Sequence, residues 1–161
     1  MLVYCDTNIY CRPLDDQSQS RIKAETEAFL GILEQVERNE IVLVGSDILT
    51  AEVSRISSAP KRKLVELYLA HCTRHIPASL QIVQIADELV RQVQLKPKDA
   101  FHIASACDGQ VRYFLTCDDQ VKSKCEPVAR LTKQRGFEVV VLNPLEFLPL
   151  VGGEGQNEKG V

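Results

Sequence analysis

Four acidic residues stand where a parallel sheet would bring them together. Asp6 follows the apolar run LVYC and Asp118 follows YFLTC, so both come directly after expected strands. Asp99 begins the helix-like stretch DAFHIASA, and Glu52 lies one turn inside the helix-like stretch DILTAEV. Ligands of open parallel sheets collect outside the carboxyl ends of the strands. We therefore expect these four acids to form one cluster.

The chemistry of such a cluster points to a divalent cation. Carboxylates gathered at one edge repel each other and raise one another's pKa, unless a cation neutralises them. A site made only of oxygen ligands suits Mg²⁺ or Mn²⁺ better than zinc. A metal of this kind supports phosphodiester chemistry by lowering the pKa of bound water and stabilising charge on phosphate. Aspartate is also a common N-cap residue, so Asp6 and Asp99 could instead cap the helices that follow them.

Composition sets the broad class of the protein. The chain has 161 residues, of which 45% are hydrophobic, and its net charge is −3. These values predict one globular domain over residues 1–150, followed by a Gly-rich tail over 151–161 that we expect to be disordered. No apolar run approaches the roughly 20 residues that span a bilayer, so we expect a cytoplasmic protein. The negative charge argues against a protein that coats nucleic acid, but not against a nuclease.

The six cysteines suggest reduced, buried thiols. None of them forms a C-x-x-C pair, and several lie within apolar segments. A zinc site built from Cys107, Cys117 and Cys125 near His102 is the alternative, although the usual pairing of ligands is missing.

The hydrophobic pattern alternates between short β-branched runs and longer helical stretches, which predicts an α/β fold with a parallel sheet. The expected strands are Leu2 to Cys5, Ile41 to Gly45, Tyr113 to Thr116 and Glu138 to Leu142. The expected helices are Ser20 to Arg38, Ile48 to Ser57, Pro60 to Cys72, Leu80 to Val93, Asp99 to Asp108, and a segment from Asp119 to the stop at Gly136.

Four motifs, VYCDTNIY, DILTAEV, KPKDAFHIASA and FLTCDDQV, occur in this order over nearly the whole chain. Together they resemble the four acidic motifs of the PIN domain family, which includes the VapC-type ribonuclease toxins. The resemblance implies a three-layer α/β/α sandwich and RNA cleavage by a metal-activated water. It implies that the metal is bound by Asp6, Asp99 and Asp118, that Glu52 completes the acidic set, and that Asn8 and Thr116 hold the pocket by hydrogen bonds. Asp119 is the alternative fourth acid.

Two further features could serve the same site. Lys61, Arg62 and Lys63 begin a region that forms a helical arm in these folds, where they could grip RNA phosphates or simply form a solvated helix start. His102 lies about one helical turn after Asp99, so it faces either the pocket or a neighbouring strand.

These observations favour a Mg²⁺- or Mn²⁺-dependent endoribonuclease, the toxin of a type II toxin–antitoxin module. We expect its partners to be RNA, a cognate antitoxin and a second copy of the chain, with no membrane. The alternatives are a PIN-like module that binds RNA or protein without catalysis, and a housekeeping RNA-processing nuclease. A small phosphotransfer or phosphatase domain is disfavoured, because no Asp-x-Asp pair follows the first strand and no Gly-rich phosphate loop is present.

Overall fold

The structure is a computed structural model that describes residues 1–153. A five-stranded sheet forms its centre, with the strand order β3-β2-β1-β4-β5 and with all neighbouring strands parallel. The strands are β1 (Leu2–Cys5), β2 (Val42–Ser46), β3 (Cys72–Ile76), β4 (Tyr113–Leu115) and β5 (Val140–Leu142).

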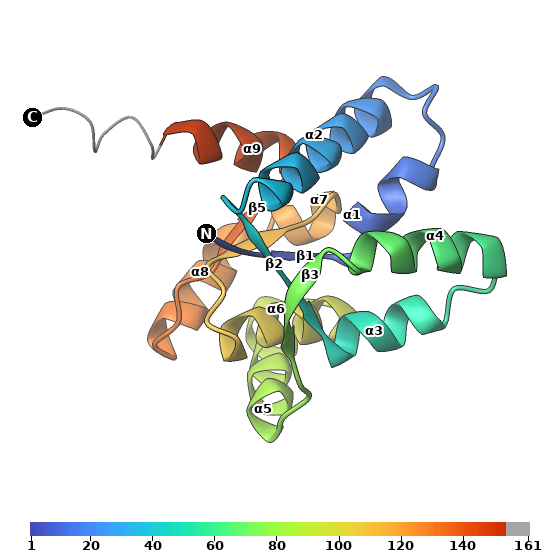
Figure 1. Cartoon of the computed structure of the whole chain (residues 1–161). Helices are drawn as coiled ribbons and strands as arrows, with labels where there is room; N and C mark the ends of the chain where they lie inside the picture. Colours follow the sequence, from blue (N-terminus) through green and yellow to red (C-terminus); the bar gives the residue numbers. More distant parts are fainter. Residues whose placement is uncertain (154–161) are drawn as a thin grey trace, which may run out of the picture.

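Helices cover both faces of this sheet, which confirms the three-layer α/β/α fold (Figure 1). One layer packs α1 (Thr7–Cys11), α2 (Ser20–Glu37), α4 (Ala59–Leu69) and α9 (Pro144–Gly153) against the sheet. The other layer contains α5 (Leu80–Glu88), α6 (Pro97–Asp108) and α8 (Cys125–Gln134). The short turn Arg12–Leu14 follows α1, and a π-helical turn, Leu89–Val93, extends α5. Within residues 1–153, no helix is both long and apolar enough to cross a membrane.

The central strand β1 shows why its sequence is apolar throughout. Val3 and Cys5 belong to the core under α2, whereas Tyr4 belongs to the core under α6, and all three are fully buried. A strand buried on both faces needs a continuous apolar run, since successive side chains point to opposite sides.

The strand order places the carboxyl ends of β1 and β4 side by side. The chain builds β2 and β3 on one side of β1, then returns to place β4 and β5 on the other side. The Asp6 N–H donates to the Leu115 carbonyl at 2.9 Å, so the segments after the two strands are joined directly. This is the switch point where doubly wound folds bind their ligands.

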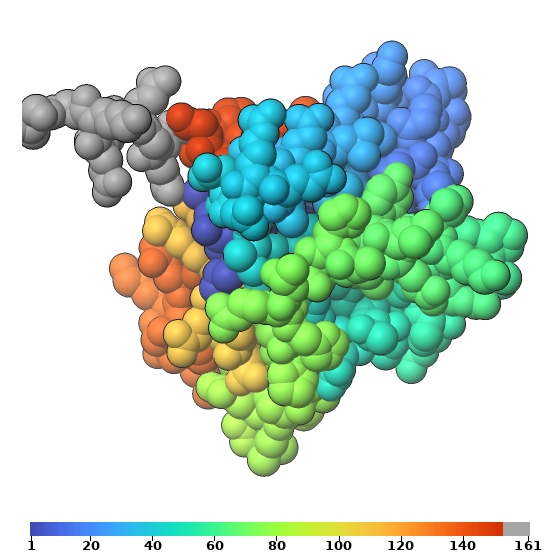
Figure 2. Space-filling view, in the orientation of Figure 1, coloured from blue at the N-terminus to red at the C-terminus, as the bar shows by residue number. Residues whose placement is uncertain are grey.

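A helical arm projects beside this edge. It consists of α3 (Asp47–Ser54) and α4, which form the lobe at the right of Figures 1 and 2. Ser46 caps α3 by accepting the Leu49 N–H at 3.0 Å, and Ser58 caps α4 by accepting the Lys61 N–H at 3.3 Å. The Ser caps fix where the arm leaves the sheet and where it turns.

The structure differs from the sequence prediction in several elements, beginning with α1, a short helix that was not among the predicted ones. The predicted helix over 60–72 ends at Leu69, and the strand β3 follows it. The sequence prediction missed this strand because its residues, CTRHI, form a largely exposed sheet edge without an apolar run. The segment after Asp118 is two helices, α7 (Asp119–Lys122) and α8, and not one. The unpredicted α9 runs to Gly153, so the predicted boundary at residue 150 falls inside a helix. The rest of the predicted disordered tail lies outside the described residues.

Candidate active site

Asp6 is a buried carboxylate, and hydrogen bonds hold one of its two oxygens. It occupies the N-cap position of α1, but its side chain makes no capping hydrogen bond. Its Oδ2 atom instead accepts from Thr116 Oγ1 and Asn8 Nδ2, each at 3.0 Å. Its Oδ1 atom lies 3.9 Å from His102 Nε2. The capping explanation for this acid is therefore wrong.

Thr116 is the centre of the hydrogen-bond network that holds Asp6. Its hydroxyl donates to Asp6 and accepts from Asn8 Nδ2 and from the Asp118 N–H, both at 3.1 Å. The Asn8 Oδ1 atom accepts the Cys117 N–H at 3.0 Å, which ties α1 to the segment after β4. The structure thus brings Asn8 and Thr116 to the site, where they orient Asp6.

Asp99 and Asp118 complete the acidic side of the pocket. Asp99 is the third residue of α6; it is buried and is not that helix's N-cap. Asp118 is the N-cap of α7 and accepts the Gln120 N–H at 2.9 Å. Burial raises the pKa of Asp6 and, together with the charges of Asp6 and Asp118, raises the pKa of Asp99. Asp99 therefore lies close enough to Asp6 and to Asp118 to be repelled by both.

Glu52 differs from the aspartates because each of its two carboxylate oxygens contacts a basic side chain. Lys98 Nζ lies 2.7 Å from Oε1, and His102 Nε2 contacts Oε2. Burial opposes ionisation, but the hydrogen bonds from His102 and Lys98 outweigh it and lower the pKa of Glu52 to about 2. Glu52 therefore stays ionised and paired at the edge of the acidic cluster.

The acidic cluster suits a hydrated divalent cation. Within residues 1–153, no group of three or more His, Cys, Asp or Glu side chains is placed to hold a metal ion, and this applies to the zinc alternative as well. Mg²⁺ keeps several waters and is usually held by only one or two carboxylates, so an open site of aspartates fits it. The raised pKa of Asp6 and of Asp99 supports this fit, since a bound cation would relieve the desolvation and repulsion that cause it.

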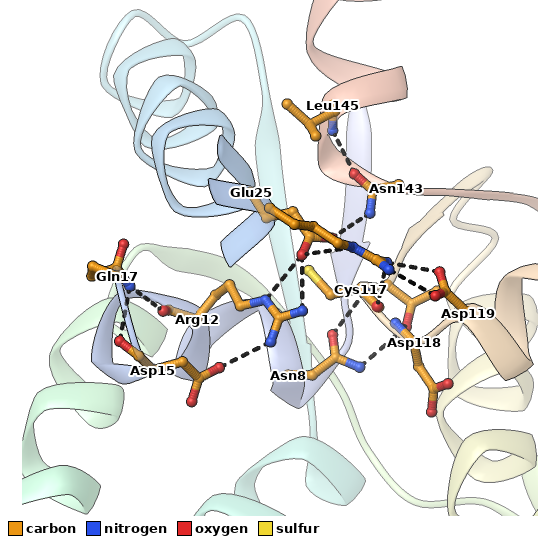
Figure 3. A network of polar contacts seen from close by, with 12 residues as sticks. Asn8, Arg12, Asp15, Gln17, Glu25, Cys117, Asp118, Asp119, Asn143 and Leu145 are labelled. Atoms are coloured by element: carbon orange, nitrogen blue, oxygen red, sulfur yellow. Dashed lines mark hydrogen bonds and ion pairs between the residues drawn. The ribbon is translucent and has the colours of Figure 1, made fainter. Parts of the chain in front are cut away.

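Asp119 points away from the acidic cluster. Its carboxylate forms two hydrogen bonds of 2.7 Å with Arg21, and its side chain is 74% exposed. In Figure 3 the two carboxylates point in different directions, and only that of Asp119 has dashed contacts. Asp118 is therefore the acid that the structure places beside Asp99.

Lys61, Arg62 and Lys63 of the arm do not form one continuous basic surface. Arg62 Nη1 donates to the Ile56 carbonyl at 2.8 Å and so holds the turn between α3 and α4. Lys61 is partly buried and Lys63 is exposed. Of these three residues, Lys61 and Lys63 make no side-chain hydrogen bond or ion pair within residues 1–153, so they are the two that can meet an anion.

Sequence reasoning missed Lys98. Lys98 and His102 are four residues apart on α6 and thus share a face of the helix, and both contact Glu52. This spacing is the signal that could have identified Lys98. The contacts of Arg21 and Glu25 beside the site span about a hundred residues of sequence, and no local pattern announces them.

The cysteines are not placed to act as nucleophiles. Burial raises the pKa of Cys107 to about 12 and raises the pKa of Cys117 as well. Both thiols therefore stay protonated near neutral pH.

A parallel sheet of this order with aspartates at the β1/β4 switch point defines an α/β protein with a candidate acidic metal site. The PIN domain family model matches residues 3–127, and the chain belongs to this family. No curated protein matches the sequence.

Two solved structures share the fold. A chain of VapBC2 from Rickettsia felis, crystallised bound to a DNA fragment from its promoter, matches with a TM-score of 0.60 and 16% identity. A chain of FitAcB from Neisseria gonorrhoeae matches with a TM-score of 0.53 and 20% identity. Each match covers 89% of this chain and 98% of the other.

The raised pKa of Asp99 leads to a stability prediction. When folding raises the pKa of an acid, the folded protein is stabilised at low pH, where the acid is protonated. This stabilisation is lost as the pH rises from the acid's ordinary pKa through its raised pKa. At neutral pH the metal-free protein bears this penalty, so Asp99→Asn should raise the melting temperature. The expected rise is a few degrees, since each kcal/mol corresponds to about 2–4 °C for a chain of this size.

Scanning calorimetry of metal-free protein at pH 4 and pH 7 measures this effect. The gain from Asp99→Asn should shrink at the lower pH, where a larger fraction of the wild-type carboxyl is protonated. A variant that is less stable than wild type at pH 7 would show that Asp99 is not in a repulsive cluster.

Proposed function

We propose that this chain is a metal-dependent endoribonuclease that hydrolyses RNA phosphodiester bonds and serves as the toxin of a type II toxin–antitoxin module. The observation that carries the proposal is the cluster of Asp6, Asp99 and Asp118 at the switch point of a PIN domain fold. Charge repulsion in this cluster favours a divalent cation, and the chemistry of such a site is phosphodiester hydrolysis.

The roles of the residues follow from their contacts. Asp6, Asp99 and Asp118 would hold Mg²⁺ or Mn²⁺, which when bound supplies an activated water and charge stabilisation at the phosphate. Asn8 and Thr116 orient Asp6 by hydrogen bonds to one of its oxygens. Glu52 completes the acidic set at the edge of the pocket.

Cavities on two sides of the acids support an extended substrate. Asp118 lines a cavity of about 560 Å³ together with Arg21 and Lys96. Glu52 lines another of about 300 Å³ together with Arg55 and Lys98. Each cavity therefore joins an acid of the cluster to basic side chains that could contact phosphates. We infer that an RNA strand crosses the acidic cluster from one cavity to the other.

Incubation of the purified protein with total RNA, with and without Mn²⁺, tests the activity. We expect metal-dependent cleavage at defined positions, seen by mapping the new 5′ ends. RNA that stays intact with Mn²⁺ present, while a control nuclease cleaves it, would contradict the proposal.

The proposed partners are a cognate antitoxin and a second copy of the chain, in the cytoplasm. The antitoxin proposal is supported by the resemblance to VapC-type toxins and by the VapBC2 and FitAcB neighbours. A short reading frame upstream that encodes a DNA-binding protein, and that protein's co-purification with this chain, would support it. A solitary gene would favour the housekeeping RNA-processing alternative.

The arm lysines give a prediction about RNA affinity. An acidic protein must attract RNA by local charge, and each phosphate contact adds roughly −0.7 to the slope of log affinity against log salt for single strands. Replacing Lys61 and Lys63 by Ala, with Arg62 left to hold its turn, should flatten this slope by up to about 1.4.

Fluorescence anisotropy of a labelled single-stranded RNA at several salt concentrations measures the slope. A slope that does not change would make these lysines a solvated helix start and no part of the RNA interface.

A further inference from the structure

Five side chains form a continuous hydrogen-bonded chain from the core to the mouth of the acidic pocket. Tyr4 Oη lies 2.6 Å from Ser46 Oγ and 2.7 Å from His102 Nδ1. His102 Nε2 contacts Glu52 Oε2, and Lys98 Nζ lies 2.7 Å from Glu52 Oε1. Ser46, Tyr4 and His102 are buried, whereas the Lys98 side chain is 64% exposed.

The hydrogen atoms of this chain can be assigned by counting donors. Ser46 Oγ already accepts the Leu49 N–H, so its own hydrogen is available to Tyr4. Burial raises the pKa of Tyr4, which keeps its hydroxyl as a donor to His102 Nδ1. His102 then carries a hydrogen on Nε2 and donates it to Glu52. The reverse direction would place an unprotonated Nε2 against a carboxylate.

Packing fixes the chain in place. The Tyr4 ring stacks on Phe114 with centroids 5.6 Å apart and meets the His102 ring edge to face at 5.8 Å. His102 is completely buried on α6, so its Nε2 atom has a defined position. Glu52 is thereby held at one oxygen by a rigid donor, and its other oxygen is directed to Lys98.

These contacts leave Glu52 poorly placed to bind a cation. Both of its oxygens already have donors, and a metal would have to displace His102 or Lys98. In contrast, within the described residues the Asp6 Oδ1 atom accepts no hydrogen bond, and its nearest cationic partner, His102 Nε2, is 3.9 Å away. Asp99 makes no side-chain hydrogen bond within the same residues. Glu52 therefore differs in function from the three aspartates.

We propose that Glu52 is a positioning residue that holds the Lys98 ammonium at the mouth of the pocket, where Lys98 binds a backbone phosphate of RNA. This inference rests on the proposed nuclease function. In this proposal the buried hydrogen bonds among Ser46, Tyr4 and His102 orient Glu52. A lysine has a long, flexible stem, so a fixed carboxylate is what gives its charge a defined location.

The surroundings of Lys98 support a phosphate contact. Its neighbours Glu52, Asp6 and Asp99 raise the pKa of Lys98, so it remains a cation. It lines the cavity of about 300 Å³ that also contains Arg55 and Phe101. A phosphate approaching four acids meets repulsion, and Lys98 is a cation that the fold holds directly against one of them, Glu52.

The test compares RNA binding and Mn²⁺ binding in the same variants. RNA binding is measured by anisotropy of a single-stranded RNA in metal-free buffer over a range of salt, so that it needs no catalysis. Lys98→Ala and Glu52→Gln should both weaken binding and flatten the salt slope by about 0.7. Arg38→Ala removes an exposed charge at the end of α2 and is the matched control, with no change in slope expected.

Mn²⁺ titration of the same proteins separates the two roles of Glu52. If Glu52 only positions Lys98, Glu52→Gln retains Mn²⁺ binding. Loss of Mn²⁺ binding in Glu52→Gln would make Glu52 a metal ligand and overturn the inference. An unchanged salt slope in Lys98→Ala would overturn it as well. Absence of RNA cleavage by the wild type contradicts only the nuclease function, because neither readout depends on cleavage.

A pair of His102 variants tests the buried chain. In His102→Gln the amide nitrogen can reach the position of Nε2 and donate to Glu52, whereas in His102→Asn it reaches only the position of Nδ1. We expect Gln to keep the wild-type salt slope and Asn to lose it, in variants that circular dichroism shows to be folded. In addition, ¹⁵N shifts of the wild-type ring should show a protonated Nε2. A ring protonated only on Nδ1 would overturn the assignment.

Discussion

Replacing Asp118 by Asn is expected to reduce RNA cleavage by about 100-fold or more, whereas the same change at Asp119 should leave cleavage unchanged. Removing even the outer partners of a metal site typically costs 10–100-fold, so loss of a ligand should cost at least this much. Asp118 faces Asp99, while Asp119 pairs with Arg21 outside the cluster. Asn is as good a helix cap as Asp, so α7 should keep its start in the Asp118 variant.

The two variants differ by one position, so each is the control for the other. Single-turnover cleavage at a fixed Mn²⁺ concentration measures the first effect, and melting temperature shows that both proteins are folded. Loss of the Arg21 contact should lower the melting temperature of the Asp119 variant slightly. If Asp119→Asn abolishes cleavage and Asp118→Asn does not, the fourth acid of the site is Asp119 and our assignment is wrong by one residue.

Glu25→Ala is expected to cause the largest loss of stability. Glu25 is fully buried on α2 and accepts from Arg12 Nη2 at 2.8 Å and from Asn143 Nδ2 at 2.5 Å, and Arg21 lies 3.4 Å away (Figure 3). Removing one partner of a buried ion pair costs about 3–5 kcal/mol, because the remaining charges lose their compensation. For a chain of this length this is a fall in melting temperature of about 6–20 °C.

Glu27→Ala is the control for this prediction. Glu27 lies on the same helix but is exposed, and changes at such surface positions usually stay within about 0.5 kcal/mol. Urea unfolding of both variants gives the free energies of unfolding. Equal values would mean that the network around Glu25 adds nothing to the stability of the fold.

The fold was largely predictable because buried parallel strands have a strong signature. β1, β2 and β4 are continuous apolar runs, and their predicted ends are within one residue of the observed ones. β3 has no such run because it is an edge strand that pairs only with β2. In α9, Pro149 lies inside the helix and masked it, since proline usually ends a helix.

The site was predictable to the extent that topology alone determines it. Asp6 and Asp118 follow neighbouring parallel strands, so the sheet itself brings them together. The partners of Glu52 and Glu25 depend on how side chains from different helices meet. Lys98 and His102 reach Glu52 across α3 and α6, and Asn143 reaches Glu25 from 118 residues away. The long-range contacts of Glu25 leave no periodic signal in the sequence, and those of Glu52 leave only the four-residue spacing of Lys98 and His102.

The most direct test of the account is a calorimetric titration of Mn²⁺ into the wild-type protein and into Asp6→Asn. The change keeps the shape of the side chain but removes the charge that burial and neighbouring acids make unfavourable without a cation. We expect saturable binding by the wild type and no measurable binding by the variant, with both proteins folded. Equal binding of Mn²⁺ by the two proteins would contradict the account, since Asp6 could then not belong to a metal site.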